Sequence, residues 1–423
     1  MINKNLITLS TLASSLLLAP MAQAAEFEAS GYVGFEWREY LQEGQFDNAQ
    51  VSQADRQYGL LAEPELVWSV ADGRHTIVFK PFARIDNEDP ERTHGDIREL
   101  SWLTYGDDWE VVAGISKVYW GVTESQHLVD VVNQTDFVEA PDGEDKLGQP
   151  MVKLTLLRDW GTLTGFVLPG FRERTFSGEE GRFRPALEID TDSAQYEAGE
   201  EDAHVDYAVR WSHTLEDYDV GLSWFNGTSR DPMLFVDLQN PTKLTPYYAQ
   251  INQFGADIQA TLDSWLWKFE AIYRSYNEAL MDDFDQLKQL GLVSQSVEDY
   301  SAATAGFEYT YYSPFETNWD IGVLTEYQYD SREDGQVAIG QNDVFLGSRI
   351  AFNDAESSEV LLGFIQDLDS RDTQNFIIEM STRIGRSVKL NVDVFLPMSD
   401  DASNVSSQFE RDDYIQVGFN YYY

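Results

Sequence analysis

An alternation of apolar residues with polar or small residues runs through most of the chain, and it limits the possible folds more than any other feature. Val33, Phe35 and Trp37 alternate with residues such as Glu36, and the stretch 388–396 repeats the pattern near the end. A period of two places one set of side chains on each face of a β-strand. The pattern therefore predicts an all-β fold whose strands have one apolar and one polar face.

About 18 segments carry this alternation, with 16 to 18 as the range we expect. A soluble β-sandwich also alternates, so the connections between the segments are needed to choose between the two architectures. The strand candidates are 26–41, 56–70, 74–87, 95–106, 108–120, 149–158, 161–173, 203–214, 218–229, 250–262, 265–277, 300–312, 317–331, 342–353, 357–368, 374–385, 386–397 and 412–423.

Short and long connections alternate along the chain. The short ones are 71–74, 159–162, 217–219 and 385–387, and the long ones are 42–56, 117–149, 173–202, 230–249 and 278–299. Short periplasmic turns and long external loops are typical of a transmembrane antiparallel up-and-down β-barrel. With an even strand count both chain ends lie on the periplasmic side, and we expect the odd-numbered connections to be the short turns.

The composition agrees with a barrel and excludes several other classes. Of 423 residues 13% are aromatic, the mean hydropathy is −0.38 and cysteine is absent, which argues against disorder, a helical membrane bundle and thiolate metal sites. With 29 basic and 73 acidic residues the net charge is −44, so nucleic acid would be repelled. Several aromatic residues occupy strand ends, where a membrane barrel places its interfacial girdles: Trp37, Trp68, Trp102, Trp109, Trp211, Trp319, Tyr327 and Tyr329.

The first 24 residues resemble a cleavable export signal. Lys4 gives a positive start, 6–18 is apolar, and 22–24 reads Ala-Gln-Ala, a small-residue cleavage site. We therefore expect residues 25–423 to form one transmembrane barrel domain, exported to the outer membrane of a Gram-negative cell.

The last ten residues resemble the terminal signal that the barrel assembly machinery recognises. That signal has a polar residue, a glycine two positions later, and alternate hydrophobic residues that end in an aromatic one. Gln416, Gly418, Tyr421 and Tyr423 match these positions. The resemblance implies that the assembly machinery is a partner during biogenesis.

Within this class the chain resembles porin-type barrels. The segment from Trp120 to Asp136 is also similar to a W-G-x-x-(D/E)-S…V-V-D-V-(I/V)-N-x-x-D stretch of large proteobacterial outer-membrane barrels of unassigned function. The close match covers roughly 20 residues, so it supports the class and the location of the protein rather than its cargo.

If odd-numbered residues of the first strand face lipid, Glu28, Ser30, Glu36 and Arg38 face the lumen. A charge facing hydrocarbon costs about 2–4 kcal/mol at the midplane, so charged strand residues should point inward. A structural ion pair inside the barrel is the alternative role for each of them. The basic pore-lining candidates are Arg38, Lys80, Arg84, Arg98, Arg210, Lys268, Arg274, Arg349, Arg383 and Lys389, and the acidic ones are Glu63, Glu65, Glu110, Asp206, Glu270, Asp320, Glu326, Asp367, Glu379 and Asp393.

The connection 117–149 is the candidate constriction loop, because porin-type barrels fold the loop at this place in the order into the lumen. Its apolar stretch 128–132 suits packing against an inner wall. We expect its carboxylates to form a negative rim that disfavours anions. These are Glu124, Asp130, Asp136 and Glu139, followed by Asp142, Glu144 and Asp145.

Three other features carry weaker expectations. Residues 278–292 have Leu280, Phe284, Leu287 and Leu290 at helical spacing, which predicts a short loop helix ending near Gly291. Acidic clusters at 86–89, 179–180, 190–192 and 200–202 can bind Ca²⁺ or Mg²⁺ weakly and bridge to lipopolysaccharide, although solvated faces are the more ordinary role. Ser125 and His127 lie near two carboxylates, but no motif of a barrel hydrolase accompanies them, so we expect no enzyme and no cofactor.

The sequence thus predicts an outer-membrane channel for passive diffusion of small hydrophilic solutes, with a preference for cations or neutral solutes. Two alternatives share the same strand pattern. One is a barrel that exports or imports a larger cargo such as a polysaccharide or a lipid-related molecule, and the other is a plugged barrel that acts through its loops. Lipid and lipopolysaccharide are the expected surroundings, and the assembly is a monomer or a trimer.

Overall fold

The computed structural model describes residues 25–46, 51–71, 73–139, 142–236, 240–289, 293, 297–332, 340–399 and 405–423. The predicted export signal at 1–24 lies outside these residues. Among the described residues no helix is long and apolar enough to cross a membrane.

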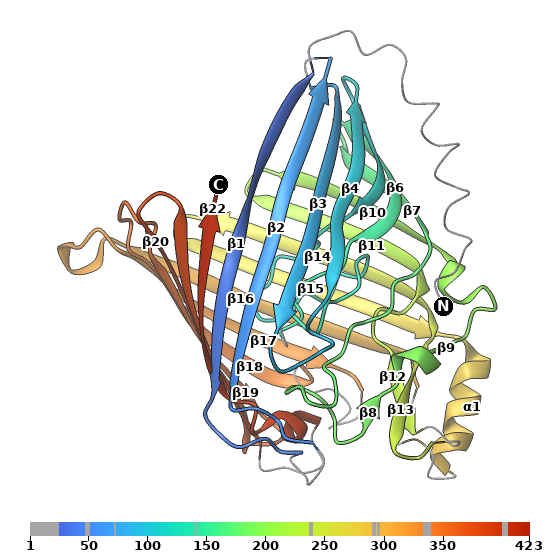
Figure 1. Cartoon of the computed structure of the whole chain (residues 1–423). Coiled ribbons are helices and arrows are strands. Elements are labelled where there is room, and N and C mark those ends of the chain that lie inside the picture. Colours follow the sequence, from blue (N-terminus) through green and yellow to red (C-terminus); the bar gives the residue numbers. More distant parts are fainter. Residues whose placement is uncertain are drawn as a thin grey trace.

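An 18-stranded antiparallel sheet closes on itself, because the first strand pairs with both the second and the last (Figure 1). The predicted closed, all-β barrel is confirmed, and each predicted strand has its counterpart. The barrel strands are β1 (Glu26–Tyr40), β2 (Arg56–Val70), β3 (His75–Asp86), β4 (Gly95–Tyr105), β5 (Trp109–Ser116), β6 (Gln149–Arg158), β7 (Gly161–Pro169), β10 (Val205–Leu215), β11 (Tyr218–Thr228), β14 (Gln250–Leu262), β15 (Trp265–Tyr276), β16 (Tyr300–Tyr312), β17 (Asp320–Asp330), β18 (Asn342–Ala351), β19 (Glu359–Asp367), β20 (Thr373–Ile384), β21 (Val388–Ser399) and β22 (Tyr414–Tyr422).

Short turns join the strands at one end of the barrel and long connections join them at the other. Because β1 starts at the short-turn end, the first connection (41–55) is a long one and the second (71–74) is a short turn. The expectation that odd-numbered connections are the short ones was therefore wrong. The outcome for the chain ends is unchanged, since β1 begins and β22 ends at the short-turn end.

The side-chain alternation sorts the wall into an apolar outer face and a polar inner face. Trp37 is 43% exposed on the outside, whereas the next residue, Arg38, is 5% exposed and points inward. The same holds on β17, where Tyr327 is exposed and Glu326 is buried. The outward set is the apolar band that a lipid-facing barrel requires.

The wall is irregular where proline interrupts two neighbouring strands. Pro64 of β2 and Pro81 of β3 have no N–H group to donate to the ladder. Pairing between β2 and β3 is interrupted there, and the register of β3 against β4 shifts between Lys80 and Pro81. Lys80 and Glu65 bridge the gap with a 2.7 Å ion pair.

The long connections build a small unit at the loop end of the barrel. It contains a four-stranded sheet and one helix, which lie beside each other at the lower right of Figure 1. Leu280 and Phe284 of the helix are buried there with Ala249 and Val297, so the predicted loop helix is confirmed, while Leu290 and Gly291 lie outside the described residues. The elements are β8 (Glu188–Ile189), β9 (Gln195–Tyr196), β12 (Met233–Val236), β13 (Lys243–Tyr248) and α1 (Glu278–Gln289), and short 3-10 helices are η2 (Thr191–Ser193), η3 (Glu201–Ala203), η4 (Pro314–Glu316) and η5 (Val405–Phe409).

Candidate functional site: the inward-folded loop and the inner wall

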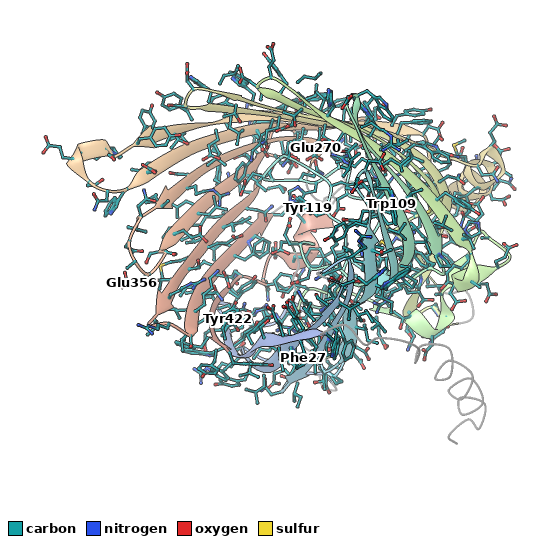
Figure 2. The ribbon with its side chains drawn as sticks, turned by 90° about the horizontal axis from the view of Figure 1, so that it is seen from above. Phe27, Trp109, Tyr119, Glu270, Glu356 and Tyr422 are labelled. Atoms are coloured by element: carbon teal, nitrogen blue, oxygen red, sulfur yellow. The ribbon has the colours of Figure 1, made fainter. Side chains whose placement is uncertain are left out.

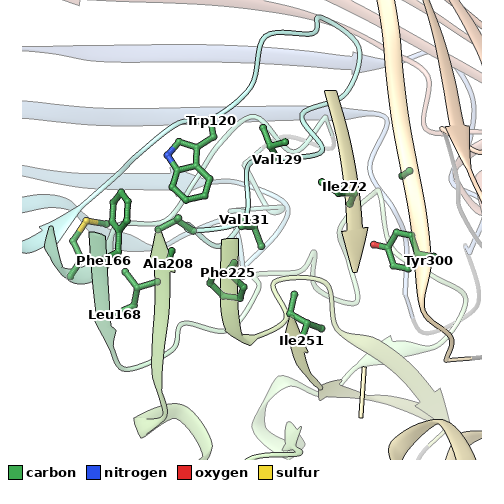
Figure 3. Close-up of a cluster of buried hydrophobic side chains, with 13 residues drawn as sticks. Trp120, Val129, Val131, Phe166, Leu168, Ala208, Phe225, Ile251, Ile272 and Tyr300 are labelled. Atoms are coloured by element: carbon green, nitrogen blue, oxygen red, sulfur yellow. The ribbon is translucent and has the colours of Figure 1, made fainter. Parts of the chain in front are cut away.

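In the connection between β5 and β6, the described residues 117–139 and 142–148 lie inside the barrel, and we call them the inner loop. Its apolar residues form a core with inward-facing apolar side chains of the wall (Figure 3). Val129 and Val132 are fully buried in this core, as the apolar composition of 128–132 predicts. The core comprises Trp120, Val129, Val131 and Val132 of the inner loop and Met151, Phe166, Leu168, Ala208, Phe225, Ile251, Ile272, Tyr300 and Ala302 of the wall.

A fully buried glutamate on β15 holds the tip of the inner loop. Glu270 accepts hydrogen bonds from the backbone N–H groups of Val122 (2.6 Å), Thr123 (3.0 Å) and Val129 (3.2 Å), and from the Thr123 hydroxyl (2.8 Å). Donors directed at a carboxylate stabilise its charged form without a cation. Figure 2, which looks down on the barrel, shows Tyr119 of the inner loop within the ring of strands.

A second buried glutamate, on β17, continues the attachment. Glu326 accepts hydrogen bonds from the N–H groups of Glu124 (2.8 Å) and Ser125 (2.9 Å) and from the Ser125 hydroxyl (2.5 Å). Gln328 donates to the same hydroxyl at 2.6 Å. Sequence reasoning named Glu270 and Glu326 only as lumen-facing charges and missed that they anchor the inner loop. Their inward phase, opposite a loop rich in exposed backbone donors, was the available signal.

Other residues of the 120–136 motif also have structural roles. Asn133 accepts from Val118 N–H and donates to the carbonyl groups of Ser116 and Leu147, which closes the neck of the inner loop. Asp130 accepts from Trp120 N–H at 3.3 Å. Side-chain hydrogen bonds of this kind replace the strand ladder for a segment that leaves the wall.

Gly121 is required where the inner loop passes closest to Glu270. Its φ is +139°, and a Cβ atom there would lie 3.0 Å from Glu270 Oε1. We expect Gly121→Ala to destabilise the folded barrel by about 1–3 kcal/mol through backbone strain, measured as a lower midpoint of the heat-induced band shift. Gly165→Ala is the control, because a Cβ at that position of β7 meets no atom within 4 Å. Equal midpoints for the two variants would contradict this account.

The four carboxylates of the candidate constriction are not a free negative rim. Each one faces a cation, so most of their charge is compensated within the barrel, in contrast to our expectation. Glu124 pairs with Lys268 (3.3 Å) and Arg349, and Asp130 pairs with Lys146 (3.5 Å). Asp136 pairs with Arg98 (2.7 Å) and Glu139 pairs with Arg84 (2.6 Å).

These pairs show that the inner loop spans the lumen. Glu124 and Ser125 are attached to β15, β17 and β18, while Asp136 and Glu139 are attached to β3 and β4. In the circular strand order β3 and β15 lie on opposite sides of the ring. The inner loop is thus held at both walls and divides the space between them.

Two later carboxylates of the inner loop, Asp142 and Asp145, are exposed to the lumen. The enclosing barrel wall, with Glu139 and Asp142, raises the pKa of Asp145 to about 6. Asp142 is within electrostatic range of Glu379 on β20 and Asp393 on β21, which lie directly opposite each other in register. Among the described residues neither Glu379 nor Asp393 has an ion-pair partner.

The ten basic pore-lining candidates all fall on the inward phase of their strands, and most are engaged with other side chains. Arg38 donates to Gln416 and to the Tyr40 hydroxyl, and Arg210 forms two bonds with Asp257 (2.7 and 2.9 Å). Arg383 and Lys389 lie opposite each other in register. Their contribution to a pore stays a prediction. The remaining partners are Glu65 for Lys80, Glu36 and Glu139 for Arg84, Asp96 and Asp136 for Arg98, Glu124 for Lys268, and Asp231 and Gln253 for Arg274.

The proposed assembly signal lies on β22, at the seam of the barrel. Gln416 points inward and donates to Asp393, and Gly418 lies beside Glu36. Tyr421 and Tyr423 are more than half exposed. The arrangement presents the aromatic residues outward, and recognition by the assembly machinery stays a prediction.

Two further expectations can be compared with the contacts. Ser125 is bound to Glu326 and Gln328, whereas His127 contacts Tyr119 and pairs with Glu144 at 3.0 Å, so the two side chains are committed to different partners.

The acidic cluster 86–89 is not simply a solvated face. Asp86 accepts from Gln57 and from two backbone N–H groups, and the buried Asp89 accepts from Gly178 N–H, so both fasten loops.

No protein-family model matches the sequence. No curated protein sequence matches it either. Solved structures do match over nearly the whole chain. OpdO of Pseudomonas aeruginosa matches with a TM-score of 0.51 and 10% identity, covering 94% of this chain and 96% of its own. A BenF-like porin from Pseudomonas fluorescens Pf-5 matches with a TM-score of 0.51 and 9% identity, covering 96% and 99%. OccAB3 of Acinetobacter baumannii matches with a TM-score of 0.52 and 9% identity, covering 94% and 99%. The fold is therefore that of porin-like outer-membrane barrels.

Proposed function

We propose that the protein is an outer-membrane channel through which small hydrophilic solutes diffuse passively. The observation that carries this proposal is the inner loop, which is fastened to opposite walls of a closed barrel and narrows a lumen lined by charged and polar side chains. Such an arrangement selects solutes by width and fixed charge and needs no bond chemistry. The shared fold with a BenF-like porin supports the same reading.

We further propose a preference for cations or neutral solutes. The support no longer comes from Glu124, Asp130, Asp136 and Glu139, because their charges are paired. It comes from the exposed Asp142 and Asp145 of the inner loop and from Glu379 and Asp393 on the facing wall. Fixed carboxylates on both sides of a passage attract cations and repel anions.

Single-channel recording in planar bilayers tests the function. The folded protein should give discrete conductance steps, and a KCl gradient should give a reversal potential of cation-selective sign. Glu379→Gln combined with Asp393→Asn should move that potential toward zero, while Glu28→Gln, at the open end of β1, should leave it unchanged. A folded, heat-modifiable barrel that never conducts would overturn the channel proposal.

The cation preference should weaken as the pH falls. Because the enclosing barrel wall raises the pKa of Asp145 to about 6 and also raises the pKa of Asp142, both carboxyls lose their charge on acidification sooner than ordinary aspartates. We expect the reversal potential to be largest at pH 7.5 and to shrink between pH 7 and pH 5. Asp142→Asn with Asp145→Asn should have the smaller potential at pH 7.5 and a weaker pH dependence than the wild type. A dependence unchanged in the double variant would contradict the assignment.

One observation favours the alternative of a barrel closed at its outer end. Phe183, in the connection between β7 and β10, has a φ of +56° and is buried among Tyr40, Phe395, Phe409 and Tyr414 of the wall and the last loop. A positive φ is strained for an aromatic residue and is kept only where the surroundings impose it. The bilayer measurement separates the two functions, since a plugged barrel gives no conductance until this contact is removed.

A further inference from the structure

A histidine at the junction of two loops faces hydrogen-bond acceptors on both ring nitrogens. His94 Nδ1 is 3.2 Å from the carbonyl oxygen of Arg92. Its Nε2 is 3.5 Å from Asp136 Oδ2 and 3.5 Å from Glu139 Oε1. A neutral imidazole has only one N–H group. With that group on Nδ1, a nitrogen lone pair points at two carboxylates, and something positive must lie between them.

The spacing fits a metal ion better than a direct ion pair. Charge-assisted N–H···O bonds are about 2.7–2.9 Å long, so 3.5 Å is too great for a proton shared with either carboxylate. Ligand atoms about 2.1 Å from a tetrahedral ion lie about 3.4 Å from one another. The three ligand atoms of His94, Asp136 and Glu139 all lie within 4.8 Å of one another.

Two of these atoms are buried without a hydrogen-bond partner, namely His94 Nε2 and Asp136 Oδ2. Asp136 itself is fully buried. Arg98 Nη2 is 2.7 Å from Asp136 Oδ2, close enough for an ion pair but not aligned as a hydrogen bond. Buried polar atoms left without a bond point to an ion or water at that place.

The other atoms of the three side chains are held as metal ligands usually are. A ligating histidine donates its second ring N–H to a carbonyl or carboxylate, and ligating carboxylates are themselves hydrogen-bonded. Here Nδ1 of His94 faces the Arg92 carbonyl and Asp136 Oδ1 accepts from the Thr175 hydroxyl at 2.7 Å, while Arg84 Nε donates to both Glu139 Oε2 (2.8 Å) and Glu139 Oε1 (3.0 Å).

The neighbouring arginines do not over-compensate the carboxylates. With His94 neutral, the two groups of ion pairs that meet at its Nε2 contain five carboxylates and four guanidinium groups, and so have a net charge of −1. A cation bound at His94 Nε2 would neutralise that charge. The carboxylates are Glu36, Asp86, Asp96, Asp136 and Glu139, and the guanidinium groups belong to Arg84, Arg92, Arg98 and Arg172.

A cavity at the loop end of the barrel borders this group of side chains. This cavity of about 670 Å³ between the long connections is lined by His94, Leu147, Arg172 and Thr175, among others. Of the three side chains only His94 lines this cavity, which has room for the water that would complete a four-ligand site.

We propose that His94, Asp136 and Glu139 form a binding site for a divalent transition-metal ion of the Zn²⁺ type. One imidazole nitrogen with two carboxylate oxygens suits Zn²⁺ or its neighbours rather than Ca²⁺ or Mg²⁺, which take oxygen ligands alone. The ion ties the far arm of the inner loop, which carries Asp136 and Glu139, to the connection 87–94. The site thus lies at the loop end of the barrel, beside the acidic cluster 86–89, whose Asp86 pairs with Arg92.

The test is to titrate Zn²⁺ alone into the folded, detergent-solubilised barrel at pH 7.5 and to measure binding by calorimetry. We expect one Zn²⁺ per barrel, and with Co²⁺ in its place the visible absorption bands of a tetrahedral site. Thr175→Val, which frees Asp136 Oδ1, should weaken binding by about 10–100-fold, and His94→Ala should weaken it further. His75→Gln is the matched control, because it removes a histidine at the opposite end of β3 and should leave binding unchanged.

Two results would overturn the proposal. One is Zn²⁺ binding that is equal in the wild type and in His94→Ala, with both barrels shown to be folded by their heat-modifiable bands. The other is a ¹⁵N NMR spectrum of metal-free barrel in which His94 stays an imidazolium at pH 7.5 and does not change on addition of Zn²⁺. That spectrum would assign the positive charge between the carboxylates to a proton.

Discussion

Glu270→Ala should detach the inner loop from the wall, which lowers stability and raises the single-channel conductance together. The substitution leaves three backbone N–H groups without their acceptor, while the Thr123 hydroxyl keeps the Gln126 carbonyl oxygen. A buried donor left unpaired costs about 1–3 kcal/mol, so we expect a loss of at least about 3 kcal/mol even if water reaches some of the groups. The midpoint of the heat-induced band shift and the conductance in planar bilayers measure the two effects.

Glu270→Gln tests the same contact with a milder change, because its amide oxygen can keep some of the hydrogen bonds but carries no charge. Its effects should fall between those of the wild type and the alanine variant. Glu28→Ala removes an exposed carboxylate of β1 and controls for a general change in lumen charge. If Glu270→Ala and Glu28→Ala raised the conductance equally, the effect would be one of charge, and the anchoring role of Glu270 would be wrong.

Arg84→Ala should be the most destabilising change of a single charged side chain in the wall. Arg84 is buried and binds both Glu36 and Glu139, and Glu139 is itself 4% exposed in its side chain. Removing one partner of a buried ion pair leaves an uncompensated charge and costs about 3–5 kcal/mol. Circular dichroism during thermal unfolding should show the loss, and the variant should also release the far arm of the inner loop.

Arg56→Ala is the matched control for this prediction. Arg56 pairs with Glu39 at 2.9 Å, yet its side chain is 64% exposed, so the interaction is screened by water and salt. We expect no measurable change in the unfolding midpoint. A similar fall for both variants would mean that burial of the Arg84 pairs does not determine their energy.

The barrel could be predicted from the sequence because the residue pattern that specifies its strands is local. Each strand such as β14 or β16 must turn one face to lipid and one to the lumen, and the period of two records this at every position. All strand bounds agree with the predicted ranges to within a few residues. The largest deviations are at the end of β7, predicted to reach residue 173 but ending at Pro169, and at the end of β5, predicted to reach residue 120 while the chain leaves the wall after Ser116. Trp120 is apolar because it packs on Phe166 inside the lumen rather than on lipid.

The partners of the charged side chains could not be predicted, because they depend on which strands lie across the lumen. Glu124 and Lys268 are separated by 144 positions, and no local pattern joins them. The expected negative rim was wrong for this reason: the carboxylates were visible in the sequence, whereas Arg84, Arg98 and Arg349 reach them only through the closed ring. His94 could not be recognised as part of a site from the sequence, since its neighbours Asp136 and Glu139 come from another loop.

The seam between β1 and β22 has a consequence for how the protein folds. Arg38 donates to Gln416 across 378 positions of the chain, so this pairing has the highest loop-closure cost in the barrel and a high contact order. Until it forms, both terminal strands offer rows of unpaired N–H and C=O groups, which invite pairing with other chains. The polar contact of Arg38 with Gln416 lies on this seam and favours the correct register. Assembly is therefore limited by one late, long-range event, and protection of the two open edges until then decides between a closed barrel and aggregation.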